Sequence, residues 1–112
     1  MPRDDTTDGR SRSSHREHDA AMADLSGFQR DILWVLYERE PCNGLATEDA
    51  LESYYGTTVN HSHVYTNLDQ LTESGFIDKR PGEGRANEYR LTEFARRALE
   101  RRREWLNDRT SA

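Results

Sequence analysis

The chain has 112 residues, of which 33% are apolar and 33% are charged, so it can build one small domain with a thin core. Its formal net charge of −5 excludes the broad positive field of a protein that binds nucleic acid regardless of sequence. No apolar run approaches the roughly 18 residues of a membrane span and no signal peptide is present, so we expect a cytoplasmic protein without a membrane partner.

The basic side chains are almost all arginine, with Lys79 as the single lysine among 16 basic residues. Abundant acidic residues with so little lysine resemble the composition of proteins from extreme halophiles. In molar salt the Debye length is about 3 Å, which nearly screens out the repulsion between an acidic surface and phosphates. The single cysteine, Cys42, excludes an intrachain disulfide and favours a structural thiol over a redox sensor.

Residues 1–24 are rich in Arg, Asp, Ser, Thr and His, and Met22 is the large apolar side chain within them. Because this segment can bury too little apolar surface to offset the conformational entropy lost on ordering, we predict a mostly disordered tail. Its end, from about His15 through Ala23, is able to extend the next helix. His15 and His18 have a spacing that a metal could use, but without a third ligand nearby a solvated tail is favoured.

Ser26 is a good N-cap for a first helix that runs to about Glu40. Its main apolar stripe contains Phe28, Ile32, Val35 and Leu36. A second set of apolar residues lies on other faces: Leu33, Trp34 and Tyr37. A helix that is apolar on two sides is usually buried on two sides, and in so short a chain we expect the second surface to be another subunit.

A break at residues 41–44 precedes a second helix, predicted over residues 47–55 and ended by Gly56. A third helix follows the N-cap Asn60 and stops at Gly75, which takes the left-handed conformation that side chains resist. Two helices joined by a short turn in this way form a helix-turn-helix.

The third helix has two different faces when its residues are placed at about 100° each. Its inner residues fall within about 60° of one another: Val64, Leu68 and Leu71. The opposite side is polar and free to touch another molecule: Ser62, His63, Thr66 and Gln70.

Two antiparallel strands are predicted next, over residues 76–80 and 87–91, with an exposed loop of one proline and two glycines between them. The residues predicted to point inward are Ile77, Tyr89 and Leu91. Those predicted to reach solvent or a ligand are Lys79, Arg80 and Arg90. A polar-faced helix that runs into a hairpin is typical of the recognition helix and wing of a DNA-binding domain.

Thr92 is suited to cap a last helix that reaches about Asp108. Its apolar stripe contains Phe94, Ala95, Ala98, Leu99, Trp105 and Leu106. Because the preceding elements already form a closed unit, we expect a symmetric homodimer in which this helix packs on the first helix of its mate. The expected interface residues are Leu33, Trp34, Tyr37, Phe94, Ala98, Leu99, Arg102, Trp105 and Leu106. Arg102 must snorkel or pair with an acidic residue across that interface.

The recognition helix and the start of the wing follow a spaced pattern: Ser62-x-x-Tyr65-x-x-Leu68-x-x-Leu71-x-x-x-Gly75-Phe76-Ile77. Over about residues 25–108 this pattern resembles the PadR family of winged helix-turn-helix transcription regulators. With the acidic, lysine-poor composition, the chain is similar to archaeal PadR-like regulators, some of which are linked to the oxidative-stress response. Two departures are a short wing loop and a recognition helix without Lys or Arg.

The resemblance implies a mainly α fold with a small β hairpin, in three parts. These are a disordered or partly helical tail (residues 1–24), a winged helix-turn-helix domain (25–91) and a C-terminal dimerisation helix (92–112). It also implies that the helix face enters the major groove of double-stranded DNA. The candidate DNA contacts on the helix are Asn60, His61, Ser62, His63, Tyr65, Thr66, Asn67 and Gln70.

Base recognition needs short donors and acceptors on the exposed face, and His63, Thr66, Asn67 and Gln70 qualify. Gln and Asn engage adenine, Thr touches a thymine methyl, and Tyr65 at the flank suits a phosphate. Asn67 lies at the edge of the outward face and is a weaker candidate than Thr66. Asp69 and Glu73 would be repelled by phosphates, so the N-terminal turn is expected to enter the groove, where the helix dipole also favours phosphate. The alternative is a solvated polar face.

The candidate contacts in the wing are Lys79, Arg80, Arg85, Asn87 and Arg90. Arg85 is the best candidate to reach a minor groove, and Lys79 and Arg80 are candidates to contact the flanking DNA backbone. The alternative is an ordinary exposed hairpin that contacts no DNA. His61 and His63 point in different directions at their i, i+2 spacing, so no metal or other cofactor is expected. Salt cations bridging acidic side chains and phosphates are a further expected partner.

Three other functions are alternatives to DNA binding. A winged-helix module could present the same polar helix to a protein instead of DNA. A sensor could bind a small molecule between the first and last helices, near Trp34 and Trp105, although such aromatics are more often interface packing. An enzyme is disfavoured because no nucleophile-base pair, phosphate-binding glycine pattern or cluster of metal ligands is found.

Overall fold

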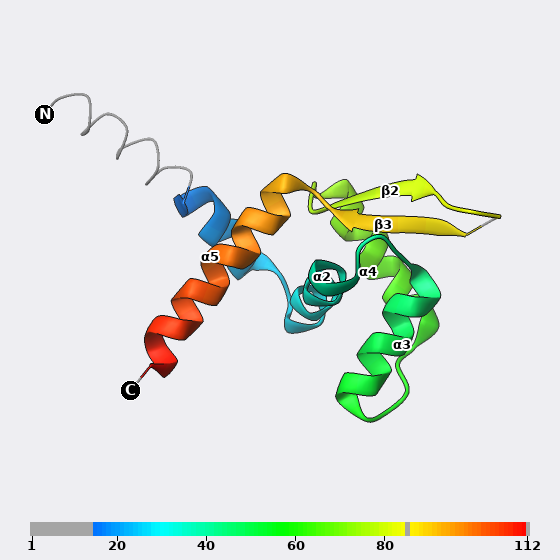
Figure 1. Cartoon of the computed structure of the whole chain (residues 1–112), viewed down its shortest axis with the longest axis horizontal. Helices are drawn as coiled ribbons and strands as arrows, with labels where there is room; N and C mark the ends of the chain where they lie inside the picture. The colour runs from blue at the N-terminus through cyan, green and yellow to red at the C-terminus, as the bar shows by residue number, and fades with distance from the viewer. Residues whose placement is uncertain (1–14, 85, 112) are drawn as a thin grey trace, which may run out of the picture.

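The computed structural model describes residues 15–84 and 86–111. The elements in chain order are a helix over 15–24, α2 (Gly27–Arg39), β1 (Cys42–Asn43), α3 (Gly44–Tyr55), α4 (His61–Glu73), β2 (Ile77–Pro81), β3 (Asn87–Leu91) and α5 (Glu93–Thr110). Figure 1 shows the hairpin β2-β3 projecting from one end of the helical body and α5 leading away from the other. None of the described helices has the length and apolar character needed to cross a membrane.

The predicted helix starts are confirmed at two of the three internal helices. Ser26 forms a capping box with Gln29, in which side chain and backbone exchange two hydrogen bonds of 3.1 Å. Asn60 caps α4 by accepting from His63 N at 3.0 Å. Helix α3 begins three residues earlier than predicted, because Asn43 Oδ1 accepts from Ala46 N at 2.8 Å and so starts the helix at Gly44.

The segment predicted as a plain break contains a strand that the sequence did not reveal. Cys42 pairs with Tyr89 and Asn43 with Glu88, which makes β1 one of the two edge strands of an antiparallel sheet ordered β1-β3-β2. Two residues carry too little alternation to be detected by periodicity. The Cys42 side chain is only 5% exposed and lies 3.4 Å from Thr47 Oγ1, as expected of a structural thiol.

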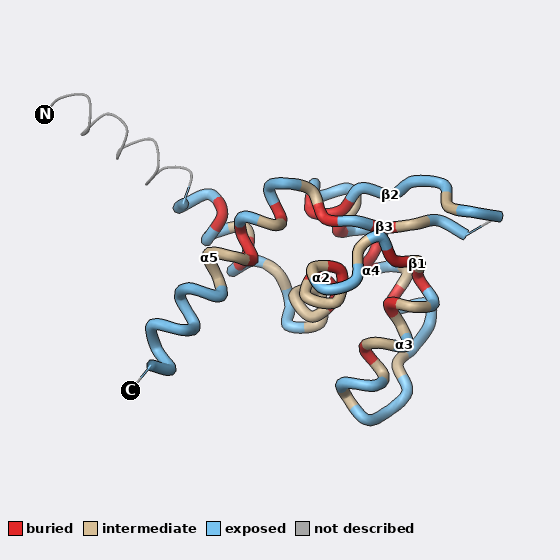
Figure 2. The backbone as a smooth tube through the Cα atoms, viewed as in Figure 1, coloured by how far each residue is buried: buried red, intermediate tan, exposed pale blue. Residues whose placement is uncertain are grey.

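One core holds the domain together where α2, α4 and the sheet meet, as the buried segments of Figure 2 show. The inward residues predicted for the hairpin are confirmed, since Ile77, Tyr89 and Leu91 are all buried. Glu40, at the end of α2, accepts from Leu91 N at 3.1 Å and forms an ion pair with Arg96. The ends of α2, β3 and α5 are thereby joined on one side of the core.

Residues 15–24 form a helix of their own, in the part of the predicted disordered or partly helical tail that was expected to be able to extend the next helix; residues 1–14 lie outside the described part. The helix does not run on into α2, because the chain bends at Leu25 and Ser26 starts a new cap. Met22 is 1% exposed, and Asp19 accepts two hydrogen bonds from Arg101 on α5, at 3.2 and 2.6 Å. This helix has few apolar residues of its own, and it is stabilised because those residues are buried against the apolar stripe of α5.

This helix corrects part of the predicted dimer interface. Leu33, Ala98 and Leu99 are at most 1% exposed within the single chain, so no partner is needed to bury them. The predicted interface requires an α5 stripe that the wing and the three central helices leave uncovered. In the structure, α2 and the helix over 15–24 both cover its N-terminal half, while the distal half of α5 is exposed in Figure 2.

Candidate nucleic-acid interface

The two faces predicted for α4 are present in the structure. Val64, Leu68 and Leu71 are at most 1% exposed and anchor the helix in the core. The opposite face is exposed and contains Ser62, Thr66, Asp69, Gln70 and Glu73. Burial of one side fixes the rotation of the helix, so the polar side is held outward as one surface.

Side chains of α2 contact residues at one side of this surface. Phe28 stacks on the His63 ring with 4.6 Å between centroids and 28° between planes. Gln29 Nε2 donates to Gln70 Oε1 at 3.3 Å. Phe28 and Gln29 were missed as contributors to the site, since helical spacing within α4 carries no information about neighbours from another helix.

Asn67 corrects the list of predicted DNA contacts. Its side chain is 6% exposed, and its amide donates to the backbone oxygen of His63 at 2.8 Å. The helical projection placed Asn67 at the edge of the polar face, and packing against the core moves that edge to the buried side. Asn60 is also engaged, because its side chain caps the helix.

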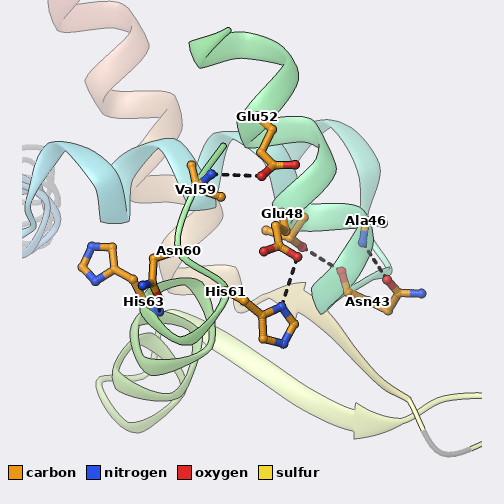
Figure 3. Close-up of polar contacts among 9 residues, drawn as sticks. Asn43, Ala46, Glu48, Glu52, Val59, Asn60, His61 and His63 are labelled. Atoms are coloured by element: carbon orange, nitrogen blue, oxygen red, sulfur yellow. Dashed lines mark hydrogen bonds and ion pairs between the residues drawn. The ribbon is translucent and has the colours of Figure 1, made fainter. Parts of the chain in front are cut away.

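Side chains of α3 contact the N-terminal turn of α4 on the other side of this surface, as Figure 3 shows. His61 Nδ1 lies 3.1 Å from Glu48 Oε2, and the His61 ring contacts Tyr65 with centroids 4.6 Å apart. Glu52 Oε2 accepts from Val59 N at 2.9 Å, which fixes the turn between the two helices. Glu48 was missed in the sequence because its role depends on how α3 and α4 pack.

Tyr65 is held against the first residue of α3. Burial, together with the negative charge of Glu48, raises the pKa of the Tyr65 phenol, so the hydroxyl stays protonated and can donate a hydrogen bond. A Cβ atom at Gly44 would overlap with the Tyr65 ring, so glycine is required there by close approach.

Replacing Gly44 with alanine is expected to destabilise the protein by about 1–3 kcal/mol, because the Tyr65 ring must leave its place. In a Tyr65→Ala background the same change should be neutral or stabilising, since alanine suits a helix better than glycine. Chemical denaturation of the four proteins of this cycle measures the effect. An equal cost of Gly44→Ala in both backgrounds would contradict the contact.

The wing presents its basic residues on two different faces. The register pairs Lys79 with Tyr89, Arg80 with Glu88 and Asp78 with Arg90. Because side chains alternate along a strand, Lys79 shares the face of the buried residues, and Arg80 and Arg90 lie on the other. Lys79 Nζ is 3.5 Å from Asp69 Oδ1, so this lysine offsets an acidic residue of α4.

The remaining wing candidates lie near the hairpin tip. Asn87 is exposed and pairs with Pro81 at the end of the strands. Arg85, the predicted minor-groove residue, lies outside the described residues. The tip is closed by a hydrogen bond from Gly82 N to Ala86 O at 2.8 Å.

The predicted dimer residues that are not buried differ in their surroundings. Tyr37 donates to Glu100 Oε2 at 3.2 Å and lies under the Arg96 guanidinium, so its contacts are made within the chain. Exposed apolar surface remains on α5 at Phe94, Trp105 and Leu106. The Arg102 and Arg109 guanidinium groups lie 5.1 and 4.1 Å from the centre of the Trp105 ring. Arg102 therefore stacks on an aromatic ring of its own helix.

The two tryptophans do not share a binding site. Trp34 lines a groove of about 640 Å³ between α2 and α3, whereas Trp105 lines a separate hollow of about 240 Å³ between α5 and the helix over 15–24. Within the described residues of a single chain, these two hollows are therefore separate and do not join into the predicted sensor site between the first and last helices. Within residues 15–84 and 86–111, no group of three or more His, Cys, Asp or Glu residues could hold a metal ion.

Three packed helices, a helix-turn-helix formed by α3 and α4, and a following hairpin define a winged helix-turn-helix protein. Residues 32–101 match the family model described as the transcriptional regulator PadR-like family, and the chain belongs to this family. The predicted fold, the predicted family and the prediction of a DNA-binding transcription regulator are confirmed. No curated protein sequence matches the chain.

Solved structures of RosR are similar to this chain. One, described as a complex of hsRosR, is 40% identical, with a TM-score of 0.81 over 85% of this chain and 82% of that one. H. salinarum RosR grown from NaBr is 43% identical, with a TM-score of 0.75 over 80% of each chain. Bacillus subtilis PadR in complex with operator DNA shares the fold at 24% identity, with a TM-score of 0.58 over 72% of this chain and 47% of that one.

Proposed function

We propose that this regulator reads a specific DNA site with the exposed face of α4. The observation that carries the proposal is a polar helix face, free of bulky side chains, whose opposite side is fully buried beside a wing. Bacillus subtilis PadR, which has the same fold, has been solved with operator DNA. A protein-interaction module is the alternative, and it is not favoured by membership in a family of transcription regulators.

In this docking Thr66 and Gln70 contact base edges and Tyr65 donates to a phosphate at the rim of the groove. The N-terminal turn of α4 lies deepest, because Asp69 and Glu73 are repelled by phosphates farther along. The ion pair between Lys79 and Asp69 weakens that repulsion and ties the wing to the recognition helix. Arg80, Arg85 and Arg90 contribute from the wing.

A homodimer would place two such helices in successive major grooves, roughly 34 Å apart, on a pseudo-palindromic site. Trp105 and Leu106 on the distal half of α5 support this assembly, since they remain 46% and 40% exposed in a single chain. The protein then acts in the cytoplasm by occupying a promoter, without enzymatic chemistry and without a cofactor.

Adaptation to high salt is part of the proposal. The acidic, lysine-poor composition and the similarity to H. salinarum RosR support binding in molar salt. Long-range attraction contributes little there, so short-range contacts and bridging cations carry the affinity. The resemblance to archaeal stress regulators supports a stress-responsive role.

Alanine at Thr66 or Gln70 is expected to relax the preference for individual base pairs, at about 1–3 kcal/mol of discrimination each. Alanine at Arg85 should instead lower affinity for all sequences alike. Selection of bound sequences from a random DNA pool measures both effects. The docking is wrong if all three variants keep the affinity and the sequence preference of the wild type.

Aspartate at both Trp105 and Leu106 is expected to convert the dimer to a monomer, because two carboxylates would face an apolar interface. Loss of the dimer should also weaken binding to a two-fold-symmetric site. Sedimentation velocity measures the first effect, and Asn107→Asp, an exposed position on the same helix, is the matched control. A wild type that sediments as a monomer would overturn the proposed assembly.

A further inference from the structure

The hydrogen bonds around His63 determine which ring nitrogen carries the proton. The His63 backbone oxygen can only accept, so the Asn67 group 2.8 Å away must be the amide NH2 and not the amide oxygen. The same amide nitrogen lies 3.3 Å from His63 Nδ1. Its second N–H therefore has an acceptor only if Nδ1 is unprotonated, which leaves the proton of a neutral ring on Nε2.

His61 has the opposite arrangement two residues earlier. Its Nδ1 lies 3.1 Å from the Glu48 carboxylate, and an ionised carboxylate only accepts, so this Nδ1 carries a proton. Figure 3 shows the two rings on opposite sides of the first turn of α4. The neutral His61 ring thus offers an acceptor at Nε2, and the neutral His63 ring offers a donor.

The His63 ring is also fixed in orientation. Its face stacks on Phe28 at 4.6 Å, its Nδ1 is occupied by Asn67, and the residue is nevertheless exposed on the flank of the polar face. A side chain that is already oriented loses little conformational entropy when it forms a contact with a ligand. The free edge that carries Nε2 is the part of the ring left to make that contact.

We infer that Asn67 is a positioning residue that holds His63 as its Nε2–H tautomer, so that His63 donates a hydrogen bond to an acceptor on DNA. This inference rests on the proposed function and gives the buried Asn67 a role in it. The acceptor is either a phosphate oxygen or a base edge such as guanine O6 or N7.

The tautomer is measured without DNA, on the full-length protein with ¹⁵N-labelled histidine, by long-range ¹H–¹⁵N spectra recorded at a pH at which the spectra themselves show one proton per ring. We expect the proton on Nε2 of His63 and on Nδ1 of His61. In Asn67→Ala the His63 signals should move toward the tautomer mixture of the exposed His15, while His61 stays unchanged. Asn67→Leu, which fills the buried volume, serves the same purpose if the alanine variant unfolds.

A proton on Nδ1 of His63, or a His63 spectrum unchanged by loss of the Asn67 amide, would overturn the assignment. Either result would show that Asn67 does not select the tautomer. The unchanged His61 ring is the internal control for the fold of the α4 N-terminus.

The contact with DNA is tested by affinity. His63→Ala should weaken binding about three- to tenfold per half-site, the value of one hydrogen bond, and His63→Gln should retain most of the affinity through its own NH2. Uniform weakening on all sequences indicates a phosphate acceptor, and altered preference at one symmetric pair of positions indicates a base. Loss of the Asn67 amide should weaken binding in the wild type but add nothing to His63→Ala.

Wild-type affinity in His63→Ala, or an equal loss from the Asn67 substitution in both backgrounds, would overturn the inference, because the second result indicates a merely structural asparagine. If the wild type binds no DNA at all, the proposed function fails and the DNA contact fails with it. The spectra of the free protein distinguish that case, since they report the pairing of Asn67 and His63 independently.

Discussion

Thr66→Asp is expected to lower the affinity for the specific DNA site by at least about 100-fold. Thr66 is exposed on the face of α4 whose back is buried by Val64 and Leu68, so the new carboxylate cannot rotate into the core or away from the groove. A negative charge pressed toward phosphates and base acceptors costs several kcal/mol, and about 3 kcal/mol corresponds to the expected loss.

The control for this experiment is Thr110→Asp, which makes the same chemical change at an exposed position in the last turn of α5. Both variants alter the net charge equally, so the control removes the general effect of charge on DNA binding. Fluorescence anisotropy on a labelled site measures both affinities. Equal affinities of the two variants would show that the polar face of α4 does not meet the DNA.

Met22→Asp is expected to destabilise the protein by about 3–5 kcal/mol. Met22 is 1% exposed and lies in the hollow formed with Ala98 and Trp105, and its backbone oxygen accepts from Arg30 at 3.0 Å. Truncating a buried methionine alone costs about 2–5 kcal/mol, and a carboxylate without a partner adds to the cost. A small domain has only about 5–15 kcal/mol of stability, so this is a large fraction.

Ala20→Asp is the matched control for Met22→Asp, because Ala20 is exposed on the same helix. Its expected cost is about 1 kcal/mol or less, mainly the lower helix propensity of aspartate relative to alanine. Urea denaturation followed by tryptophan fluorescence measures both free energies of unfolding. If the two variants were equally stable, the helix over 15–24 would not be packed on α5 as the structure has it.

The sequence predicted best those features of the fold that depend only on neighbouring residues. The caps at Ser26 and Asn60, the positive φ at Gly75 and the alternation of Ile77, Tyr89 and Leu91 each depend on a few neighbouring residues. Such features are predictable because the physics that creates them is contained in the segment itself.

The features that sequence analysis missed depend on partners distant in the chain. The helix over 15–24 was predicted only as a possible extension of the next helix, whereas it is a separate helix stabilised by the surface of α5 about 80 residues later, as the bond between Asp19 and Arg101 shows. The two-residue strand β1 exists only because Tyr89 and Glu88 are there to pair with it. Periodicity within a segment cannot reveal either one.

The sequence predicted the exposure of the central residues of the candidate DNA interface, but not the contacts of the residues at its margin. Thr66 and Gln70 lie in the exposed face as expected, since their position on the helix decides their direction. Asn67 is buried, and Lys79 is engaged by Asp69, because packing of α4 on the core and on the wing decides those positions. Helical projection is therefore least informative about the exposure of residues at the margin of a helix face.

We expect this regulator to bind a specific, two-fold-symmetric DNA site through short-range contacts that survive high salt. The most direct test is a titration of the purified protein on fragmented genomic DNA, at low and at multimolar potassium chloride, with the bound fragments sequenced. We expect a pseudo-palindromic site to be enriched at both salt concentrations. Affinity that falls steeply with salt would show that counterion release dominates, and no enrichment at either concentration would contradict specific DNA binding altogether.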